Sequence, residues 1–216
     1  MGEQQTTGAG GRFMVQPLDG ADVLAEHREH FAGMDHIVGT YFPNSFRLMA
    51  RQPDILEACV ALGRVVMRRP GTIGIPLKWM IAHMVSSAAG CRYCTAHTIE
   101  HAADVALTPE QLADIWSFER SPHFSEAERA VMRFALAAGQ SPNGVTEAHF
   151  EELRAHHDDD QIVEIVAVIA YWGFWNRWND TFATPLEASP LAFARQHLTA
   201  RGWEPGRHAA PAAEPS

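Results

Sequence analysis

A cysteine pair followed by a histidine is the part of this sequence best suited to chemistry. Cys91 and Cys94 stand three positions apart, and His97 follows about one helical turn after Cys94. Residues at this spacing share one face of a helix, so the two thiols can close a small disulfide with little rearrangement. The spacing predicts a redox-active dithiol with a histidine within reach as a base or charge partner.

The start of the predicted helix favours the thiolate, which is the reactive form of cysteine. Both cysteines fall in the first turn of a helix that we expect to open after Gly90. Free N–H groups and the helix macrodipole favour negative charge at that end. Such a setting can lower a thiol pKa from about 8.5 to roughly 3.5–7.5.

Other uses of a C-x-x-C pair fit the spacing less well. Attachment of a c-type haem needs histidine directly after the second cysteine, where Thr95 stands. Zinc would need both cysteines with His97 and His101, and one helix does not readily wrap four ligands around a metal. A zinc site that borrows His83, or a structural pair of buried thiols, stays open. We expect neither a metal nor a cofactor.

Three residues near the dithiol are candidates for a proton relay or a pocket. His83, on the preceding helix, either faces the same pocket or is a satisfied core histidine. His101 lies one turn beyond His97, where we favour a solvated surface histidine over a relay member. Trp79 lies one turn before His83 on the same face. The remaining cysteine, Cys59, is predicted to be a core thiol.

The elements that position these residues are all predicted to be helices. Strand signals are weak, whereas proline at a first turn, glycine at a helix end and several capping boxes mark helix boundaries. We expect helices over residues 21–32, 53–67, 76–89, 91–106, from 109 onward, 125–139, 146–156 and 158–178. The sequence therefore predicts an all-α fold of about seven to eight helices.

Five aromatic residues gather in the last of these helices. They could line an apolar pocket, but we favour the core or a subunit interface as their place. They are Tyr171, Trp172, Phe174, Trp175 and Trp178.

Length and composition suit a single domain. The chain has 216 residues, 46% of them hydrophobic, which is enough to bury a core without disulfides. We expect one domain over residues 13–204 between disordered ends at 1–12 and 205–216. A net charge of −9 with scattered basic residues argues against a nucleic-acid surface.

The sequence shows neither a membrane span nor a secretory signal. No apolar run reaches the roughly 18 residues that a spanning helix needs, and the first twelve residues lack an apolar core. We therefore expect a cytoplasmic protein in a reducing compartment, where three cysteines do not form a structural disulfide framework.

The chain resembles the carboxymuconolactone decarboxylase-like superfamily, and within it the AhpD-like alkyl hydroperoxidase branch. The run Ala89-Gly90-Cys91-Arg92-Tyr93-Cys94-Thr95-Ala96-His97 carries most of the resemblance. Segments 77–82, 124–129 and 176–180 add to it, and the resemblance covers residues 43–187.

This resemblance implies an AhpD-like helical bundle that assembles as a homo-oligomer, a trimer or hexamer. It also implies that Cys94 attacks a peroxide and that Cys91 resolves the product as a disulfide. Helix electrostatics alone would favour Cys91, which is nearer the helix start; we follow the family because His97 is closer to Cys94. An organic hydroperoxide is the expected substrate, and a dithiol protein or small thiol the expected reductant.

Two positions depart from the family pattern. The relay glutamate of the family stands twelve positions before the first cysteine, where this chain has Trp79. The relay histidine falls at Thr98, so His97 comes one position early, a rotation of about 100° on a helix. We consider that His83 could replace the missing carboxylate.

The leading prediction is thus an antioxidant oxidoreductase with peroxiredoxin activity that uses Cys94, Cys91 and His97. Two alternatives stay open. One is a lactone-acid enzyme like the superfamily's namesake, which by resemblance works without a redox cysteine pair. The other is a non-enzymatic oligomeric redox sensor or binding protein, an alternative that Trp79 supports.

Overall fold

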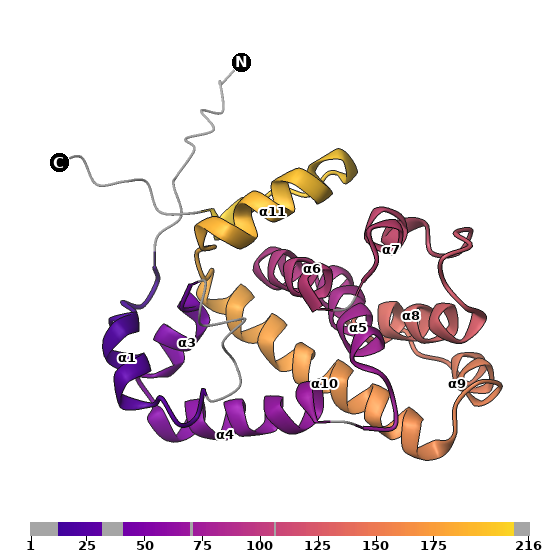
Figure 1. Cartoon of the computed structure of the whole chain (residues 1–216), viewed down its shortest axis with the longest axis horizontal. Coiled ribbons are helices and arrows are strands. Elements are labelled where there is room, and N and C mark those ends of the chain that lie inside the picture. The colour runs from indigo at the N-terminus through magenta and orange to yellow at the C-terminus, as the bar shows by residue number, and fades with distance from the viewer. Residues whose placement is uncertain (1–12, 32–40, 70, 106, 210–216) are drawn as a thin grey trace.

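The computed structural model describes residues 13–31, 41–69, 71–105 and 107–209 (Figure 1). These residues form helices, turns and loops without a strand, which confirms the predicted all-α fold. The helices are α1 (Gly20–Glu26), α3 (Asn44–Met49), α4 (Pro53–Gly63), α5 (Ile75–Ala88), α6 (Arg92–Val105), α7 (Pro109–Asp114), α8 (Glu126–Ala138), α9 (Glu147–Arg154), α10 (Asp159–Phe182) and α11 (Ala188–Leu198). The π-helical segment η1 (Arg64–Arg68) and the 3₁₀ turns η2 (Ile115–Ser117), η3 (Thr199–Arg201) and η4 (Gly206–His208) complete them.

The capping signals in the sequence place several of these helices. Capping boxes form at Thr108, Ser125 and Asp158, where each side chain accepts from the backbone three residues on. Helix α10, predicted over residues 158–178, runs further than expected, to Phe182, and its C-cap residue Ala183 lies in the left-handed region with φ of 48°. Two described helices, α3 and α11, were not predicted, because neither has a side-chain cap.

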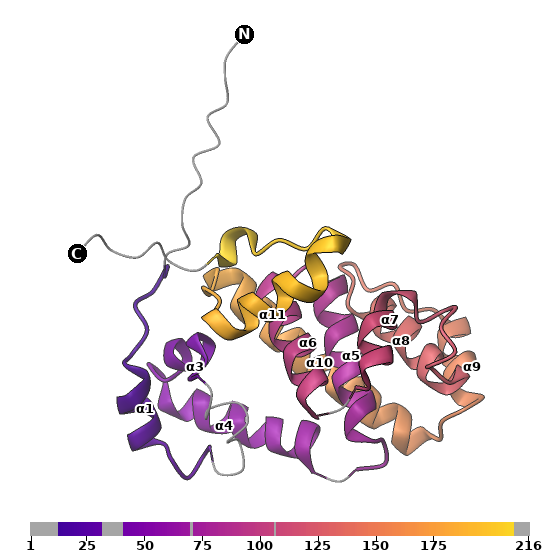
Figure 2. The same cartoon turned by 45° about the horizontal axis from the view of Figure 1, so that its top comes forward.

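Helices α5 and α6 form the centre of the molecule. They pack against one another, α5 also packs against α8 and α10, and α6 against α11. Figure 1 shows the long α10 running below this central pair, and in Figure 2 it passes behind the pair. An unbroken run of α5, residues 78–86, is buried, as expected of a helix with neighbours on every side.

A buried lysine ties the central helices to η1. The Nζ atom of Lys78 donates to the carbonyl of Val66 at 2.8 Å and pairs with the carboxylate of Glu164 on α10 at 2.5 Å. Burial alone would raise the pKa of Glu164, but hydrogen bonds from Lys78, Thr72 and backbone N–H groups lower it to about 2. Lys78 and Glu164 therefore link η1, α5 and α10 to one another.

The C-terminal segment is ordered beyond the expected end of the domain. The sequence predicts a disordered tail from residue 205, but Gly206–His208 forms a turn whose His208 is fully buried. The backbone N–H of Leu186 donates to the carbonyl of His208 at 2.9 Å, and His208 Nδ1 contacts the carbonyl of Thr184 at 2.8 Å. The expected disordered residues 1–12 and 210–216 lie outside the described residues.

In the part of the chain that the structure describes, no helix combines the length and the apolar character needed to cross a membrane. Even the 24-residue α10 is not apolar enough over a sufficient length to span a bilayer.

Candidate active site

The cysteine pair lies where helix α6 begins, as the spacing predicts. Gly90, with φ of 73°, ends α5 in the left-handed region that glycine favours, and Cys91 follows directly. Cys91 and Cys94 are joined by a disulfide with their Cα atoms 5.3 Å apart. The backbone N–H of Cys94 also donates to the Cys91 sulfur at 3.2 Å. The pair can therefore hold the oxidised form of a dithiol within one helical turn.

Cys94, and not Cys91, lines a cavity in the helical bundle. Its sulfur accepts from the side-chain amide of Asn179 at 3.6 Å and lies 3.5 Å from the carbonyl of Trp175. The same Asn179 amide donates to the Trp175 carbonyl at 3.1 Å, which fixes its position. An amide N–H directed at sulfur favours the negatively charged thiolate once the disulfide is reduced.

The cavity wall is mainly aromatic and aliphatic. Its volume is about 80 Å³, so a large substrate would require side chains to move. It is lined by Pro43, Ser45, Phe46, Val60, Gly63, Arg64, Met67, Arg68, Trp79, Tyr93, Cys94, His97, His101, Tyr171, Trp172, Trp175 and Asn179. Of the five aromatic residues grouped in the sequence, Tyr171, Trp172 and Trp175 line the cavity. Phe174 is exposed, and Trp178 does not line the cavity.

His97 shares the cavity wall with Cys94, but its ring nitrogens are bonded elsewhere. Nε2 lies 2.8 Å from Glu187 Oε2, and Nδ1 lies 3.0 Å from the phenol oxygen of Tyr41. Its ring also packs on Tyr93 with centroids 4.2 Å apart. Among the described contacts neither nitrogen bonds to Cys94, so in this oxidised form His97 lies in the cavity wall without a direct bond to the disulfide.

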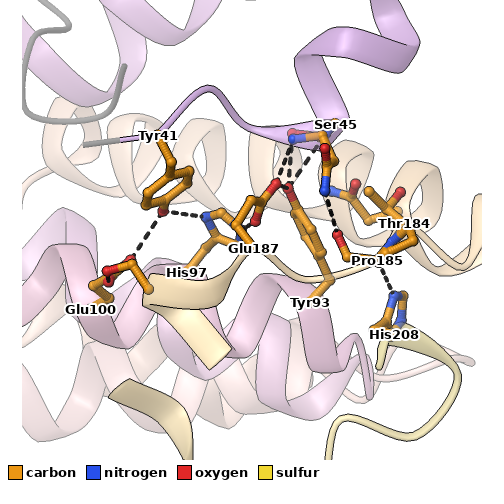
Figure 3. A network of polar contacts seen from close by, with 12 residues as sticks. Tyr41, Ser45, Tyr93, His97, Glu100, Thr184, Pro185, Glu187 and His208 are labelled. Carbon is orange, nitrogen blue, oxygen red and sulfur yellow. Dashed lines mark hydrogen bonds and ion pairs between the residues drawn. The ribbon is translucent and has the colours of Figure 1, made fainter. Parts of the chain in front are cut away.

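Both partners of His97 are themselves fixed by further contacts (Figure 3). Glu187 Oε1 accepts from the hydroxyl of Tyr93 at 2.8 Å and from the backbone N–H of Asn44. Tyr41 donates to Glu100 Oε2 at 3.0 Å. Burial, and then the charges of Glu100 and Glu187, raise the pKa of Tyr41. We call Glu187, His97, Tyr41 and Glu100 the His97 cluster.

Sequence reasoning missed three of the four members of the His97 cluster. Glu187 and Tyr41 reach His97 across 90 and 56 positions of the chain. Glu100 belongs to the same helix as His97, but its role depends on Tyr41. No local pattern marks any of the three, since these contacts join α6 to the segments that precede α3 and α11.

The three candidate relay or pocket residues occupy different surroundings. Trp79 is buried in the cavity wall between His101 and Trp172, with ring centroids 5.3 and 5.9 Å away. His101 is 4% exposed and lines the cavity, so the surface position that we favoured for it is wrong. It is buried because α6 has packed neighbours along this face.

His83 does not line the cavity. Its Nδ1 lies 3.1 Å from the hydroxyl of Thr98, and its ring packs against Trp116. Complete burial lowers the pKa of His83 to about 3, which keeps the imidazole neutral. Of the two interpretations of His83, the structure shows the core histidine, although its Nε2 has no hydrogen-bond partner among the described residues. The suggested replacement of the family carboxylate by His83 has no geometric support.

The described part of the chain shows no clear set of metal ligands. No group of three or more His, Cys, Asp or Glu side chains there is arranged to hold a metal ion. Cys59 is buried outside the disulfide, and burial raises its thiol pKa to about 12.

Comparison with known proteins identifies a matching family and similar solved structures. The sequence model of the carboxymuconolactone decarboxylase family matches residues 53–137, which include α5, α6 and the cysteine pair. No curated protein matches the chain significantly. The debrominase Bmp8, solved as a cysteine-to-alanine variant with 2,3,4-tribromopyrrole, is 33% identical, with a TM-score of 0.79 over 87% of this chain and 98% of that chain.

Two further solved structures agree. Bmp8 without ligand is 34% identical, with a TM-score of 0.77 over 84% of this chain and 96% of that chain. An AhpD-core, peroxidase-related protein from Ralstonia eutropha is 23% identical, with a TM-score of 0.70 over 85% and 96% of the two chains, and shows the shared fold. Together the matched family, the fold and the cysteine pair show that this chain belongs to the carboxymuconolactone decarboxylase/AhpD-like superfamily.

Proposed function

We propose that the protein is a dithiol-dependent reductase of small, apolar organic molecules. One observation carries the proposal: Cys94 lines an aromatic cavity and is joined to Cys91, which does not. The cavity side of the pair can meet a substrate, and the other side can complete a disulfide. A lactone-acid enzyme, or a sensor without turnover, has no comparable support in this geometry.

The reaction transfers two electrons from the thiols to the substrate. The Cys94 thiolate attacks an electrophilic atom of the substrate and breaks its bond to the leaving group, which takes up a proton. Cys91 then attacks the Cys94 sulfur, and the disulfide forms as the captured atom departs. An external dithiol protein or small thiol reduces this disulfide and is itself oxidised.

A halogenated aromatic ring is the substrate class that we favour. Stacked and edge contacts from Phe46, Trp79 and Trp175 suit a flat ring, and a similar protein is a debrominase. Cys94 would take the halogen from carbon, and a proton would replace it on the ring. Cys91 would then release halide, so that one aryl halide and two thiols yield the arene, a disulfide, halide and a proton.

Organic hydroperoxides are the second candidate, as the family resemblance implies. Attack of Cys94 on the outer oxygen would give a sulfenic acid and an alcohol, and condensation with Cys91 would release water. Trp79, which fills the position of the family's relay glutamate, makes this candidate the weaker one. The alcohol would then need another source of protons.

Turnover with both substrate classes tests the proposal. Reduced protein with excess dithiothreitol is given 2,3,4-tribromopyrrole, 2,4,6-tribromophenol or cumene hydroperoxide, while bromide and peroxide are measured. We expect bromide release that Cys94→Ser abolishes and Cys59→Ser, a change at the thiol outside the pair, leaves intact. Peroxide loss without bromide release would select the second candidate. Neither reaction above the rate of dithiothreitol alone would contradict the proposal.

A further inference from the structure

The His97 cluster forms a chain of three close contacts that each need one hydrogen. Glu100 Oε2 lies 3.0 Å from the Tyr41 oxygen, which lies 3.0 Å from His97 Nδ1. His97 Nε2 lies 2.8 Å from Glu187 Oε2. Figure 3 shows Tyr41 between His97 and Glu100, and Glu187 between His97 and Tyr93. All three distances fall in the hydrogen-bond range, and a hydrogen bond needs one hydrogen between its two atoms.

Counted in their usual forms, the four side chains supply only two of these hydrogens. Tyr41 brings one, because its raised pKa keeps the phenol protonated. A neutral imidazole brings one, and two ionised carboxylates bring none. Three contacts therefore share two hydrogens unless the cluster holds another proton.

The neighbours of the cluster that the structure describes do not supply the missing hydrogen. Tyr93 and the backbone N–H of Asn44 both donate to Glu187, but to Oε1, the oxygen that does not face His97. Ser189 likewise donates to Oε1 of Glu100, while Tyr41 contacts Oε2. These contacts stabilise the two carboxylates as acceptors and leave the count along the chain unchanged.

We infer that His97 is held as a doubly protonated imidazolium in the resting protein, with Glu187 as the positioning residue that keeps it so. An imidazole is a stronger base than a carboxylate, so the third proton resides on the ring. Burial disfavours a charged ring, and the opposite charges of Glu187 and Glu100 outweigh that cost. Further titratable groups near the ring are His101, whose ring centroid lies 6.1 Å from that of His97, and Arg64 and Arg68 in the cavity wall. Among the described residues, the ion-pair partner of Glu187 is His97.

The proton has a use if the protein is the reductase proposed above. Removal of a halogen by Cys94 leaves a carbanion-like ring carbon that must gain a proton, and His97 stands in the wall of the same cavity. The leaving atom, or a water bonded to it, would replace Tyr41 or Glu187 as partner of one ring N–H. His97 is then a proton donor, and not the base that the sequence suggests.

The cycle balances in protons and electrons. An external dithiol gives two electrons and two protons to the disulfide. One proton stays on Cys91 as its thiol, and the other is released to solvent as Cys94 becomes the thiolate beside the His97 imidazolium. The next substrate takes the His97 proton together with the two electrons. When the disulfide forms again, the Cys91 thiol proton passes to His97 and restores the imidazolium of the oxidised protein.

Nitrogen NMR of the histidine rings tests the inference without any substrate. In ¹⁵N-labelled oxidised protein at pH 7, we expect both His97 nitrogens to show the shifts of protonated nitrogen. His83 should show the neutral pattern, because burial keeps its pKa near 3. A singly protonated His97 in the wild type would overturn the inference, whatever the protein does with bromide or peroxide.

The variant Glu187→Gln keeps the shape of the side chain and removes its charge. We expect His97 to become singly protonated in its NMR spectrum, and bromide release to fall about 10²-fold, the usual size of a proton-transfer contribution. Glu152→Gln, the same change at a surface ion pair with Arg133, should alter neither. A His97 that stays doubly protonated in Glu187→Gln, with the fold intact by circular dichroism, would overturn the role of Glu187.

Discussion

At the scale of single residues, the two cysteines differ in their access to the cavity. The electrostatics of a helix start would favour Cys91 as the thiolate, yet Cys94 is the one that lines the cavity and accepts from Asn179. Because Cys91 also accepts a hydrogen bond, from the backbone N–H of Cys94, access to the cavity is what distinguishes the two sulfurs. The roles taken from the family resemblance thus gain a physical reason that the spacing alone does not provide.

Asn179→Ala should make the reduced Cys94 less reactive. The variant loses the amide donor to the Cys94 sulfur, so the thiolate is less stabilised, and the rate of alkylation by iodoacetamide at pH 7 should fall about tenfold, as for one hydrogen bond to a charged group. Asn176→Ala is the matched control, because that buried amide has no described partner. Equal rates in Asn179→Ala and wild type would contradict a role for Asn179.

The sequence indicates only the local part of the site. Cys91, Cys94 and His97 lie within seven consecutive positions, so their spacing on a helix reveals them. Glu187 precedes α11 as its N-cap residue, yet its carboxylate does not cap the helix, because it bonds to His97 and Tyr93 instead. A capping motif is the usual signal of a helix start, so both α11 and Glu187 escape prediction for one reason.

At the scale of elements, helix boundaries follow the sequence where capping is local. The boxes at Thr108, Ser125 and Asp158 are predicted from residue types three apart and form as expected. The burial of His101 and the order around His208 depend instead on which helices meet. Those positions could not be assigned from periodicity, since each side chain is polar and only its neighbours decide whether it meets water.

The Lys78–Glu164 pair should make the stability of the helical core depend on acid. The folded pKa of Glu164 is lowered from 4.5 to about 2, so its contribution is present above pH 4.5 and is lost as pH falls toward 2. Glu164→Gln should lower the free energy of unfolding at pH 6 by roughly 3–5 kcal/mol, since it leaves Lys78 buried without its partner charge. Urea unfolding measures the change.

The pH dependence of unfolding distinguishes the role of Glu164 from a general effect of acid. Wild type should lose more stability between pH 4.5 and pH 2.5 than Glu164→Gln, because the variant has no carboxylate to protonate there. Glu152→Gln, at a more exposed ion pair, should follow the wild type. If Glu164→Gln lost as much stability between pH 4.5 and pH 2.5 as the wild type, Glu164 would not be the source of the acid dependence.

At the scale of the whole molecule, α10 presents an apolar surface that suits the predicted homo-oligomer. Val163, Val166 and Phe174 are 69%, 39% and 42% exposed, and Gly173 between them has open space around it. Apolar residues gathered on one helix face favour association with another surface. The trimer or hexamer implied by the family resemblance stays a prediction.

Sedimentation equilibrium checks this assembly. We expect the wild type to be larger than the 23.9 kDa of one chain, and Val163→Lys with Val166→Lys to shift it toward the monomer, because each lysine would place a charge in the interface. Ile55→Lys, an exposed apolar position on α4, is the control and should leave the mass unchanged. A monomeric wild type would contradict the prediction.

The most direct test of the central claim is a single-turnover count of thiols against product. Fully reduced protein is mixed with excess brominated substrate without external thiol, and bromide, remaining thiols and the Cys91–Cys94 disulfide are measured together. We predict one bromide for every two thiols lost, the disulfide as the protein product, and no bromide from Cys94→Ser. Bromide released without disulfide, or equally from Cys94→Ser, would contradict reduction by this dithiol.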